Sequence, residues 1–236
     1  MKGSRRPAPF EPECVSASGI VPVFPLPGVV FFPRTVLPLH VFEARYRAMV
    51  RDATAGEGLI AIALLKPGWE EDYEGSPSFH EIGTVGRIED LEPLPGGKFN
   101  LRLVGLQRVR FGAVVRSAPY RLLHARPLAE SPVDDADAAV RSAKLSLLAS
   151  HGCLIRELSD RPDAGAVLDE RIPFETAVNG ACANLPVDPA KRQSLLEEDD
   201  LFARQRRVSA MLDEILERVL RLKALRSPEE GGSGLN

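Results

Sequence analysis

The residues best suited to binding chemistry gather in one polar segment, residues 66–79. It holds the only tryptophan of the chain, Trp69, together with Tyr73 and Phe79, among four carboxylates. Aromatic rings in a long polar segment supply rigid contact area at little cost in entropy, and they commonly anchor protein interfaces. We therefore predict that Trp69, Tyr73 and Phe79 bind a polypeptide. The alternative is that the three rings fold back and close one end of the neighbouring β-structure.

Motifs for nucleotide hydrolysis and for covalent catalysis are missing from the sequence. A P-loop requires G-x-x-x-x-G-K-[ST], because backbone amides surround the phosphates while the lysine and the hydroxyl reach phosphate and Mg²⁺. The one Gly-Lys pair, Gly97-Lys98, is followed by Phe99, and Glu92 stands where the first glycine belongs. No G-x-S-x-G nucleophile elbow occurs either. The sequence therefore assigns no catalytic residue and no cofactor, and it predicts a protein that is not an enzyme.

Histidine and cysteine are too scattered to predict a metal site. The four histidines stand singly, and the three cysteines form no C-x-x-C pair. His151, Cys153 and Cys182 fall within helical patterns, where burial in a core accounts for them. We therefore expect no metal and no disulfide framework, and we expect the chain to reside in the reducing cytoplasm.

Composition excludes a disordered chain and argues against nucleic acid as a partner. The 236 residues are 44% hydrophobic and 27% charged, which is ordinary for a globular protein. Thirty Lys and Arg against 33 Asp and Glu leave a net charge of −3, so no basic excess attracts a phosphate backbone. The first residues are basic without an apolar run behind them, unlike a secretory signal, and no segment approaches the ~20 apolar residues of a membrane span.

Strand signals fill the first half of the chain. Residues 20–127 hold about six apolar or alternating segments separated by turns, with one amphipathic helix over 43–55. Residues 59–65 form a continuous apolar run, which predicts a strand buried on both faces. Residues 99–104 and 107–115 are expected to be separate strands. This spacing, without a β-α-β rhythm, predicts a small closed or nearly closed β-barrel.

After Ser131 the pattern becomes helical. Helices are predicted over 133–158, 174–184 and 189–198, and a last helix begins near Leu201. In that last helix, an apolar seam is predicted from the seven-residue recurrence of Leu201, Val208, Ile215 and Leu222. Its outer face is predicted from three acid-before-base pairs, Asp200–Arg204, Glu214–Arg218 and Glu217–Arg221. The resulting domains are a flexible tail over 1–18, a barrel over 19–130, a helical bundle over 131–226 and a flexible end over 227–236.

Five sequence blocks follow one another in a distinctive order. Residues 22–33 (PVFPLPGVVFFP) and 37–50 (LPLHVFEARYRAMV) resemble the opening signature of the Lon protease N-terminal (substrate-binding) domain family. Three later blocks are also similar to that family: 82–88 (IGTVGRI), 103–111 (LVGLQRVRF) and 183–197 (ANLPVDPAKRQSLLE). The resemblance covers about residues 20–225. Within the family, the chain is more similar to stand-alone bacterial members than to the full protease. We also expect the chain to end where a full protease would continue into its ATPase and peptidase domains.

The resemblance implies an α+β fold, in which a PUA-like small β-barrel with one inserted helix is followed by a C-terminal α-helical bundle. It also implies a non-catalytic module that binds unfolded or exposed polypeptide segments, with a separate ATPase or protease as a further partner. One alternative is a PUA-like nucleic-acid-binding module, since such barrels elsewhere bind RNA. Another is a small-ligand receptor, since cereblon carries a related domain, although its ligand pocket belongs to a different domain.

We expect the purified chain to hydrolyse neither ATP nor casein, because the sequence holds no P-loop to bind nucleotide phosphates and the resemblance includes no peptidase domain. The measurements are phosphate release and casein cleavage, each with and without ATP. ATP-independent casein cleavage that persists in a rigorously repurified sample would contradict this expectation.

Overall fold

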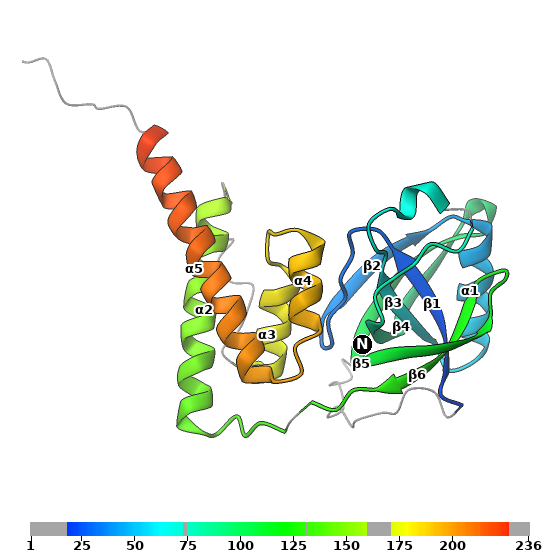
Figure 1. The fold of residues 1–236 in the computed structure, drawn as a ribbon, viewed down its shortest axis with the longest axis horizontal. Helices are drawn as coiled ribbons and strands as arrows, with labels where there is room; N and C mark the ends of the chain where they lie inside the picture. The colour runs from blue at the N-terminus through cyan, green and yellow to red at the C-terminus, as the bar shows by residue number, and fades with distance from the viewer. Residues whose placement is uncertain (1–17, 73–74, 131, 160–170, 227–236) are drawn as a thin grey trace, which may run out of the picture. The chain divides into compact units, whose positions relative to one another are not determined.

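The computed structural model describes residues 18–72, 75–130, 132–159 and 171–226. The two segments predicted to be flexible, 1–18 and 227–236, lie outside the described residues except for Ser18. The chain divides into two compact units, Met1–Ala129 and Glu130–Asn236. The first unit contains the β-strands and the second contains four helices (Figure 1).

Six strands of the first unit form one sheet in the order β2-β5-β4-β3-β1-β6. The strands are β1 (Ile20–Leu26), β2 (Val36–Val41), β3 (Leu59–Leu64), β4 (Ile82–Leu94), β5 (Lys98–Arg116) and β6 (Arg121–Pro127). β1 and β3 are parallel, and the other pairs are antiparallel. Because β6 pairs with both β1 and β5, five strands form a closed circuit of pairings, and β2 lies outside it on β5. With its helices, the chain is a mixed α+β protein.

Two apolar clusters lie on opposite faces of the strands. One cluster takes residues from all five strands of the circuit, among them Ala61 and Ala63 of β3. The other cluster joins Ile60 and Ile62 of β3 to helix α1 (Ala44–Ala55), which buries Tyr46, Met49, Val50 and Ala53. Successive side chains of a strand point to opposite faces, so β3 supplies both clusters and is buried at every position. This confirms the prediction from its continuous apolar run, and α1 also matches the predicted helix.

Glycines of β4 and β5 allow an unusually close approach of residues 31–35. A Cβ atom added to Gly105 would lie 2.3 Å from the Phe32 carbonyl oxygen, and one added to Gly86 would lie 2.7 Å from the Phe31 ring. Gly105 also exchanges backbone hydrogen bonds with this segment, donating to Thr35 at 2.9 Å and accepting from Arg34 at 2.8 Å. Gly86 and Gly105 face each other across the β4–β5 pairing.

The prediction of separate strands over 99–104 and 107–115 was therefore wrong, because β5 is one continuous strand of 19 residues. Gly105 lies inside the strand, where it serves the close approach and does not form a turn.

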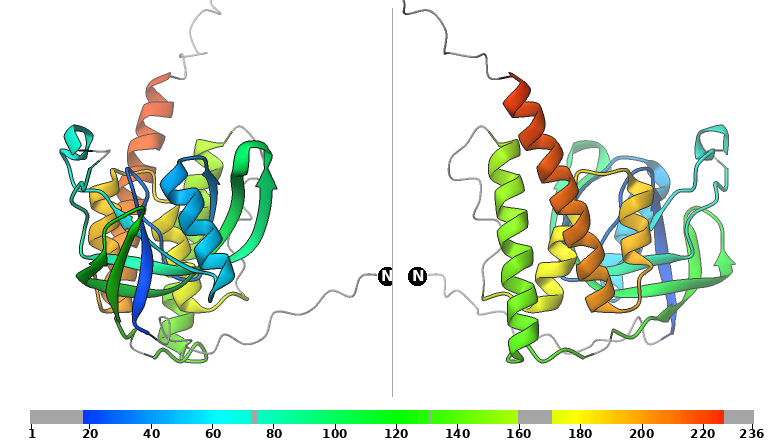
Figure 2. Two further views of the ribbon diagram at one scale, coloured as in Figure 1. Left: turned by 90° about the vertical axis from the view of Figure 1, so that its right-hand side faces the viewer. Right: turned by 60° about the vertical axis from the view of Figure 1, so that its left-hand side comes forward.

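The second unit consists of α2 (Ala138–Leu158), α3 (Phe174–Ala183), α4 (Pro189–Leu196) and α5 (Leu201–Arg226). Helix α2 begins five residues later than predicted, because the Asp137 carboxylate caps it and accepts from the amides of Ala139 (2.7 Å) and Val140 (3.4 Å). Helices α2 and α5 lie side by side (Figure 2), joined by a hydrogen bond from Ser150 to Asp213 at 2.8 Å.

Arg204 of α5 is fully buried, which corrects its predicted place on the outer face of the helix. Its guanidinium donates to the Asn179 amide oxygen at 2.8 Å, to the Glu130 carboxylate at 3.1 Å and to the Glu198 carbonyl at 2.6 Å. It thereby joins α5 to α3, to the start of the unit and to the α4–α5 connection. The other two predicted pairs, Glu214–Arg218 and Glu217–Arg221, are exposed ion pairs at 3.0 and 2.6 Å.

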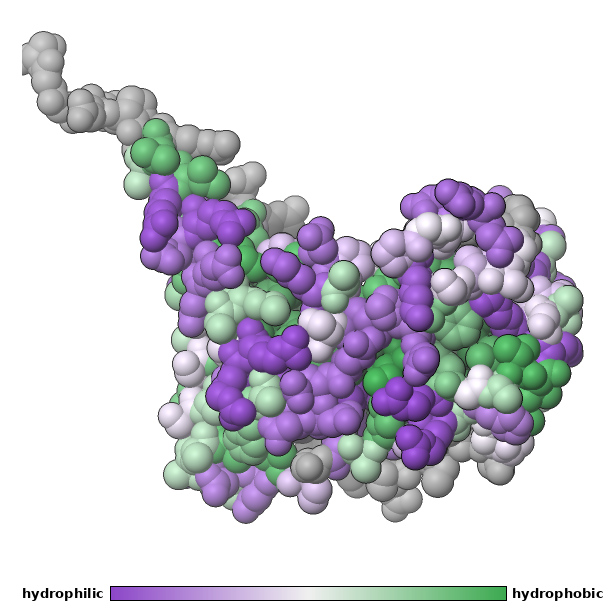
Figure 3. All heavy atoms as spheres, viewed as in Figure 1, coloured by the Kyte–Doolittle hydropathy of each residue, from purple (hydrophilic) through white to green (hydrophobic). Residues whose placement is uncertain are grey.

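The apolar seam of α5 is buried only in its first half. Leu201, Val208 and Leu212 are buried, Ile215 is half-buried, and Leu222 is 51% exposed. Figure 3 shows apolar side chains on the surface near the C-terminal end of this helix. A seven-residue repeat marks the apolar face but not the length of the helix that is covered. Among the described residues, no helix has an apolar stretch long enough to cross a membrane.

We expect Gly105→Ala to destabilise the protein by about 1–3 kcal/mol, because the added methyl group must displace the backbone at Phe32. Thermal unfolding followed by circular dichroism measures the effect as a fall in Tm of several degrees. Gly112→Ala is the matched control on the same strand, since a Cβ there would meet its nearest atom at an ordinary 3.6 Å. Equal Tm values for the two variants would contradict the close-packing interpretation.

Candidate functional site

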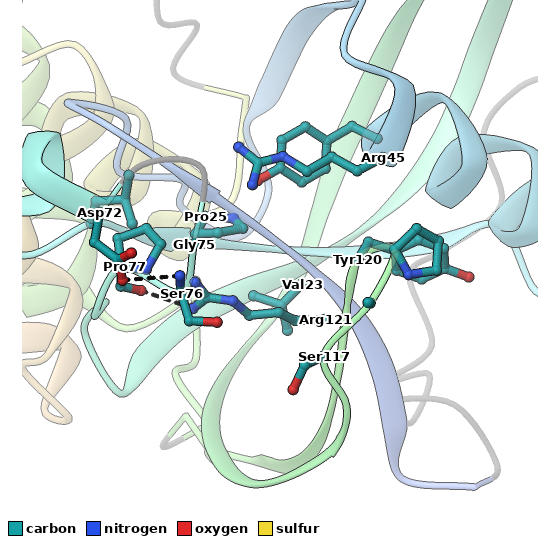
Figure 4. Close-up of a pocket in the computed structure, with 14 residues that line it drawn as sticks. Val23, Pro25, Arg45, Asp72, Gly75, Ser76, Pro77, Ser117, Tyr120 and Arg121 are labelled. Carbon is teal, nitrogen blue, oxygen red and sulfur yellow. Dashed lines mark hydrogen bonds between the residues drawn. The ribbon is translucent and has the colours of Figure 1, made fainter.

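A pocket of about 490 Å³ lies in the first unit, between β1, the start of α1, residues 75–77 and the β5–β6 connection (Figure 4). Its apolar lining comes from Val23, Pro25 and Leu65, and its rings are Tyr46 and Tyr120. Its charged residues are Arg45, Asp72 and Arg121, and the rest are small residues and prolines of the two connections: Gly75, Ser76, Pro77, Ser117, Ala118 and Pro119. The pocket thus combines apolar surface with a few polar groups, as ligand sites commonly do.

Arginine side chains stack on aromatic rings around this pocket. The guanidinium carbon of Arg45 lies 4.7 Å from the centre of the Tyr46 ring, and that of Arg116 lies 4.6 Å from the Tyr120 ring. Such stacking leaves the edge of a guanidinium, where its N–H donors are, available for hydrogen bonds.

Hydrogen bonds and ion pairs fix several of these groups. The Arg45 guanidinium is paired with the Glu43 carboxylate at 2.9 Å. The Tyr120 hydroxyl donates to the Asp52 carboxylate at 2.5 Å, and burial together with this hydrogen bond raises the pKa of Tyr120. Tyr120 therefore stays protonated and holds β6 to α1, because Asp52 belongs to that helix.

Arg121 is half-buried next to Pro77. Its guanidinium donates to the Pro77 carbonyl at 2.9 Å and lies 5.2 Å from the centre of the Phe79 ring. Burial lowers its pKa, as does the nearby charge of Arg45, whereas Tyr46 and Asp72 act in the opposite direction. Arg121 and Arg45 are thus close enough for their charges to interact, although they come from β6 and α1.

The structure describes two of the three predicted binding residues, Trp69 and Phe79. Trp69 begins a short 3-10 helix, η1 (Trp69–Asp72), and is half-buried. Phe79 is also half-buried and packs edge-on against Phe111, with ring centres 5.6 Å apart. Neither residue lines the pocket, and Tyr73 lies outside the described residues. A binding role for each of the three stays a prediction.

Sequence reasoning missed the residues that give the pocket its charge, Arg45 and Arg121. A signal for Arg45 was present, because it lies at the predicted start of α1 next to Tyr46, whose ring belongs to the core. Nothing in the local pattern marks Arg121, which is one polar residue at the start of a short strand.

No cluster of three or more metal-ligating side chains occurs in the described part of the chain. His151 is buried as predicted, and burial lowers its pKa. Cys182 is buried as predicted too, and burial raises the pKa of its thiol to about 12, so the thiolate is not available for chemistry at neutral pH. Cys153, in contrast, is only half-buried, and its sulfur accepts from Arg156 at 3.3 Å.

We expect Phe79→Ala to lower the stability of the protein by about 2–4 kcal/mol, because it removes a large ring that packs on Phe111 and under Arg121. Thermal unfolding measures the loss. An unchanged Tm would show that the ring adds nothing to the core and is retained for another purpose.

Comparison with known proteins matches most of this chain to one family. Residues 20–214 match the family described as "ATP-dependent protease La (LON) substrate-binding domain". The Lon protease of Anaeromyxobacter dehalogenans is 29% identical over 196 residues, and Lon protease 2 of Myxococcus xanthus is 31% identical over 196 residues. Each alignment covers 82% of this chain but only 23% of the relative, so the chain spans about a quarter of these curated proteins.

Solved structures agree with this match. The N-terminal domain of a Mycobacterium avium complex Lon protease superposes with a TM-score of 0.61 at 18% identity, covering 82% of this chain and 98% of that one, and shows the shared fold. A Lon N-terminal domain protein from Xanthomonas campestris gives a TM-score of 0.54 at 25% identity, covering 81% and 97%. The chain belongs to the Lon protease substrate-binding domain family.

Proposed function

We propose that this protein is a non-catalytic module that binds exposed segments of polypeptide, and that the pocket of the first unit receives part of the bound segment. Membership of a family of substrate-binding domains supports the proposal, because the substrates of a protease are polypeptides. The pocket is the observation that carries the proposal to particular residues. Its volume of about 490 Å³ lies within the range of ordinary ligand sites, roughly 300–1,000 Å³.

The lining of the pocket suits a peptide better than a purely apolar ligand. Pro25 and Leu65 offer apolar contact to a side chain, while Arg121 and Ser117 can donate hydrogen bonds. In this proposal Trp69 adds contact at the rim, because η1 runs from Trp69 directly to the lining residue Asp72.

The proposal extends to the architecture and to a second class of partner. We propose that the closed circuit of strands is a PUA-like barrel and that α2–α5 form a bundle, supported by the pairing of β6 with both β1 and β5 and by the packing among the helices. An ATPase or protease would act on the bound polypeptide, since the full-length relatives are Lon proteases.

The test is a binding titration of a dye-labelled, reduced and carbamidomethylated model protein, followed by fluorescence anisotropy. Ser117→Phe narrows the pocket and Trp69→Ala removes the ring at its rim, so we expect each to weaken binding at least tenfold, about 1.4 kcal/mol. Both changes lie on the surface or at its edge, and we expect each Tm to stay within a degree or two.

Val114→Phe is the matched control, because Val114 is exposed near the same end of β5 and does not line the pocket. Equal affinity of Ser117→Phe and the unmodified protein would place binding elsewhere. If only Trp69→Ala binds more weakly, and its Tm also falls, the Trp69 ring stabilises the fold and does not bind the ligand.

A further inference from the structure

Arg121 is a cation in an unusual setting. The guanidinium has five N–H donors, and the hydrogen bond to the Pro77 carbonyl uses only part of them. One face is covered by the Phe79 ring, so water reaches it poorly, as the burial-lowered pKa also indicates. Among the described residues no carboxylate lies within ion-pairing distance of it. Asp72 acts on Arg121 from beyond that distance, so the remaining N–H donors of this half-buried guanidinium can bind the anion of a ligand.

The other charged groups of the pocket do not supply the missing anion. The Asp72 carboxylate accepts from the Ser76 amide at 3.0 Å and is held in the turn that this bond closes. Glu43 is paired with Arg45 and Asp52 with Tyr120. Since Glu43 balances Arg45 and Asp72 lies beyond ion-pairing distance, Arg121 is the cation that the described part of the lining leaves for a ligand.

The charge of this single guanidinium selects among anions. One positive charge matches a carboxylate, which carries a single negative charge, better than a doubly charged phosphate monoester. A guanidinium edge also fits the two oxygens of a carboxylate, and such charge-assisted pairs are strong when partly shielded from water. An apolar wall made by Pro25 and Leu65 lines the same pocket and suits the chain that carries the carboxylate.

We propose that Arg121 binds a carboxylate of the polypeptide ligand, either the C-terminal α-carboxylate or the side chain of Asp or Glu. This inference rests on the proposed function and names the chemistry of the same pocket. It makes Arg121 the residue that determines specificity, while the apolar wall and Trp69 supply affinity for the rest of the segment.

The test uses four forms of one otherwise uncharged octapeptide, labelled at its blocked N-terminus with a neutral dye. The forms carry a free C-terminal acid, a C-terminal amide, an amide with one internal Glu, and an amide with Gln in place of that Glu. We expect at least one carboxylate form to bind the full chain about tenfold or more tightly than its neutral counterpart. Preference for the free acid identifies the C-terminus as the source, and preference for Glu identifies a side chain.

Arg121→Gln should abolish the preference, and Arg121→Lys should retain only part of it, because lysine keeps the charge and loses the two-pronged geometry. Arg126→Gln is the matched control, since Arg126 is exposed on the same strand and does not line the pocket. If Arg121→Gln does not fold, a reduced preference in Arg121→Lys tests the assignment to this residue, and the acid and amide peptides with the unmodified protein test the preference itself.

Equal affinity of all four peptides would overturn the carboxylate inference and leave polypeptide binding intact. A preference that survives in folded Arg121→Gln would overturn the assignment to this residue. Failure of every form to bind, together with failure of the unfolded model protein, would overturn the proposed function as well.

Discussion

Residues 31–35 pack tightly against β4 and β5, with the Phe31 ring against Gly86 and the Phe32 backbone against Gly105, and the packing of the first unit depends on that contact. It is possible only because Gly86 and Gly105 present no side chain to it. The Thr84 hydroxyl donates to the Phe31 carbonyl at 2.6 Å, and so satisfies an acceptor that the close approach removes from water. Phe31 then joins the cluster beneath α1, which fixes the helix against the strands.

The packing of α1 against the strands also determines where the pocket residues lie. Helix α1 buries Tyr46, whose ring lies 4.1 Å from that of Phe24 on β1, and the neighbouring Arg45 is thereby held at the pocket. Asp52, two turns along the same helix, holds Tyr120 just before β6 and with it the adjacent Arg121, the first residue of that strand. The two arginines are therefore positioned by core residues next to them in sequence, which keeps a polar site rigid on an apolar base.

The sequence predicts local structure well where one face or both faces of an element are covered by apolar neighbours. The run at residues 59–65 and the spacing of Tyr46, Met49 and Val50 define β3 and α1 because burial leaves a periodic pattern. Polar residues leave no such pattern. Arg204 resembles an exposed partner of Asp200 in sequence, yet its partners Asn179 and Glu130 lie 25 and 74 positions away. The pocket cannot be predicted from the local sequence either, because Arg45 and Arg121 come close together only after the strands have paired.

The gradual loss of burial along α5 has a consequence for how this helix opens. Each turn up to Leu212 is held by buried apolar contacts, whereas the turns beyond Val219 are held by exposed ion pairs such as Glu217–Arg221, which contribute about 0.3–0.5 kcal/mol each. The free energy of local opening must therefore fall toward the C-terminal end of the helix. Backbone amides in that last part would exchange with deuterium by fraying, while those near Val208 exchange only when the whole unit unfolds.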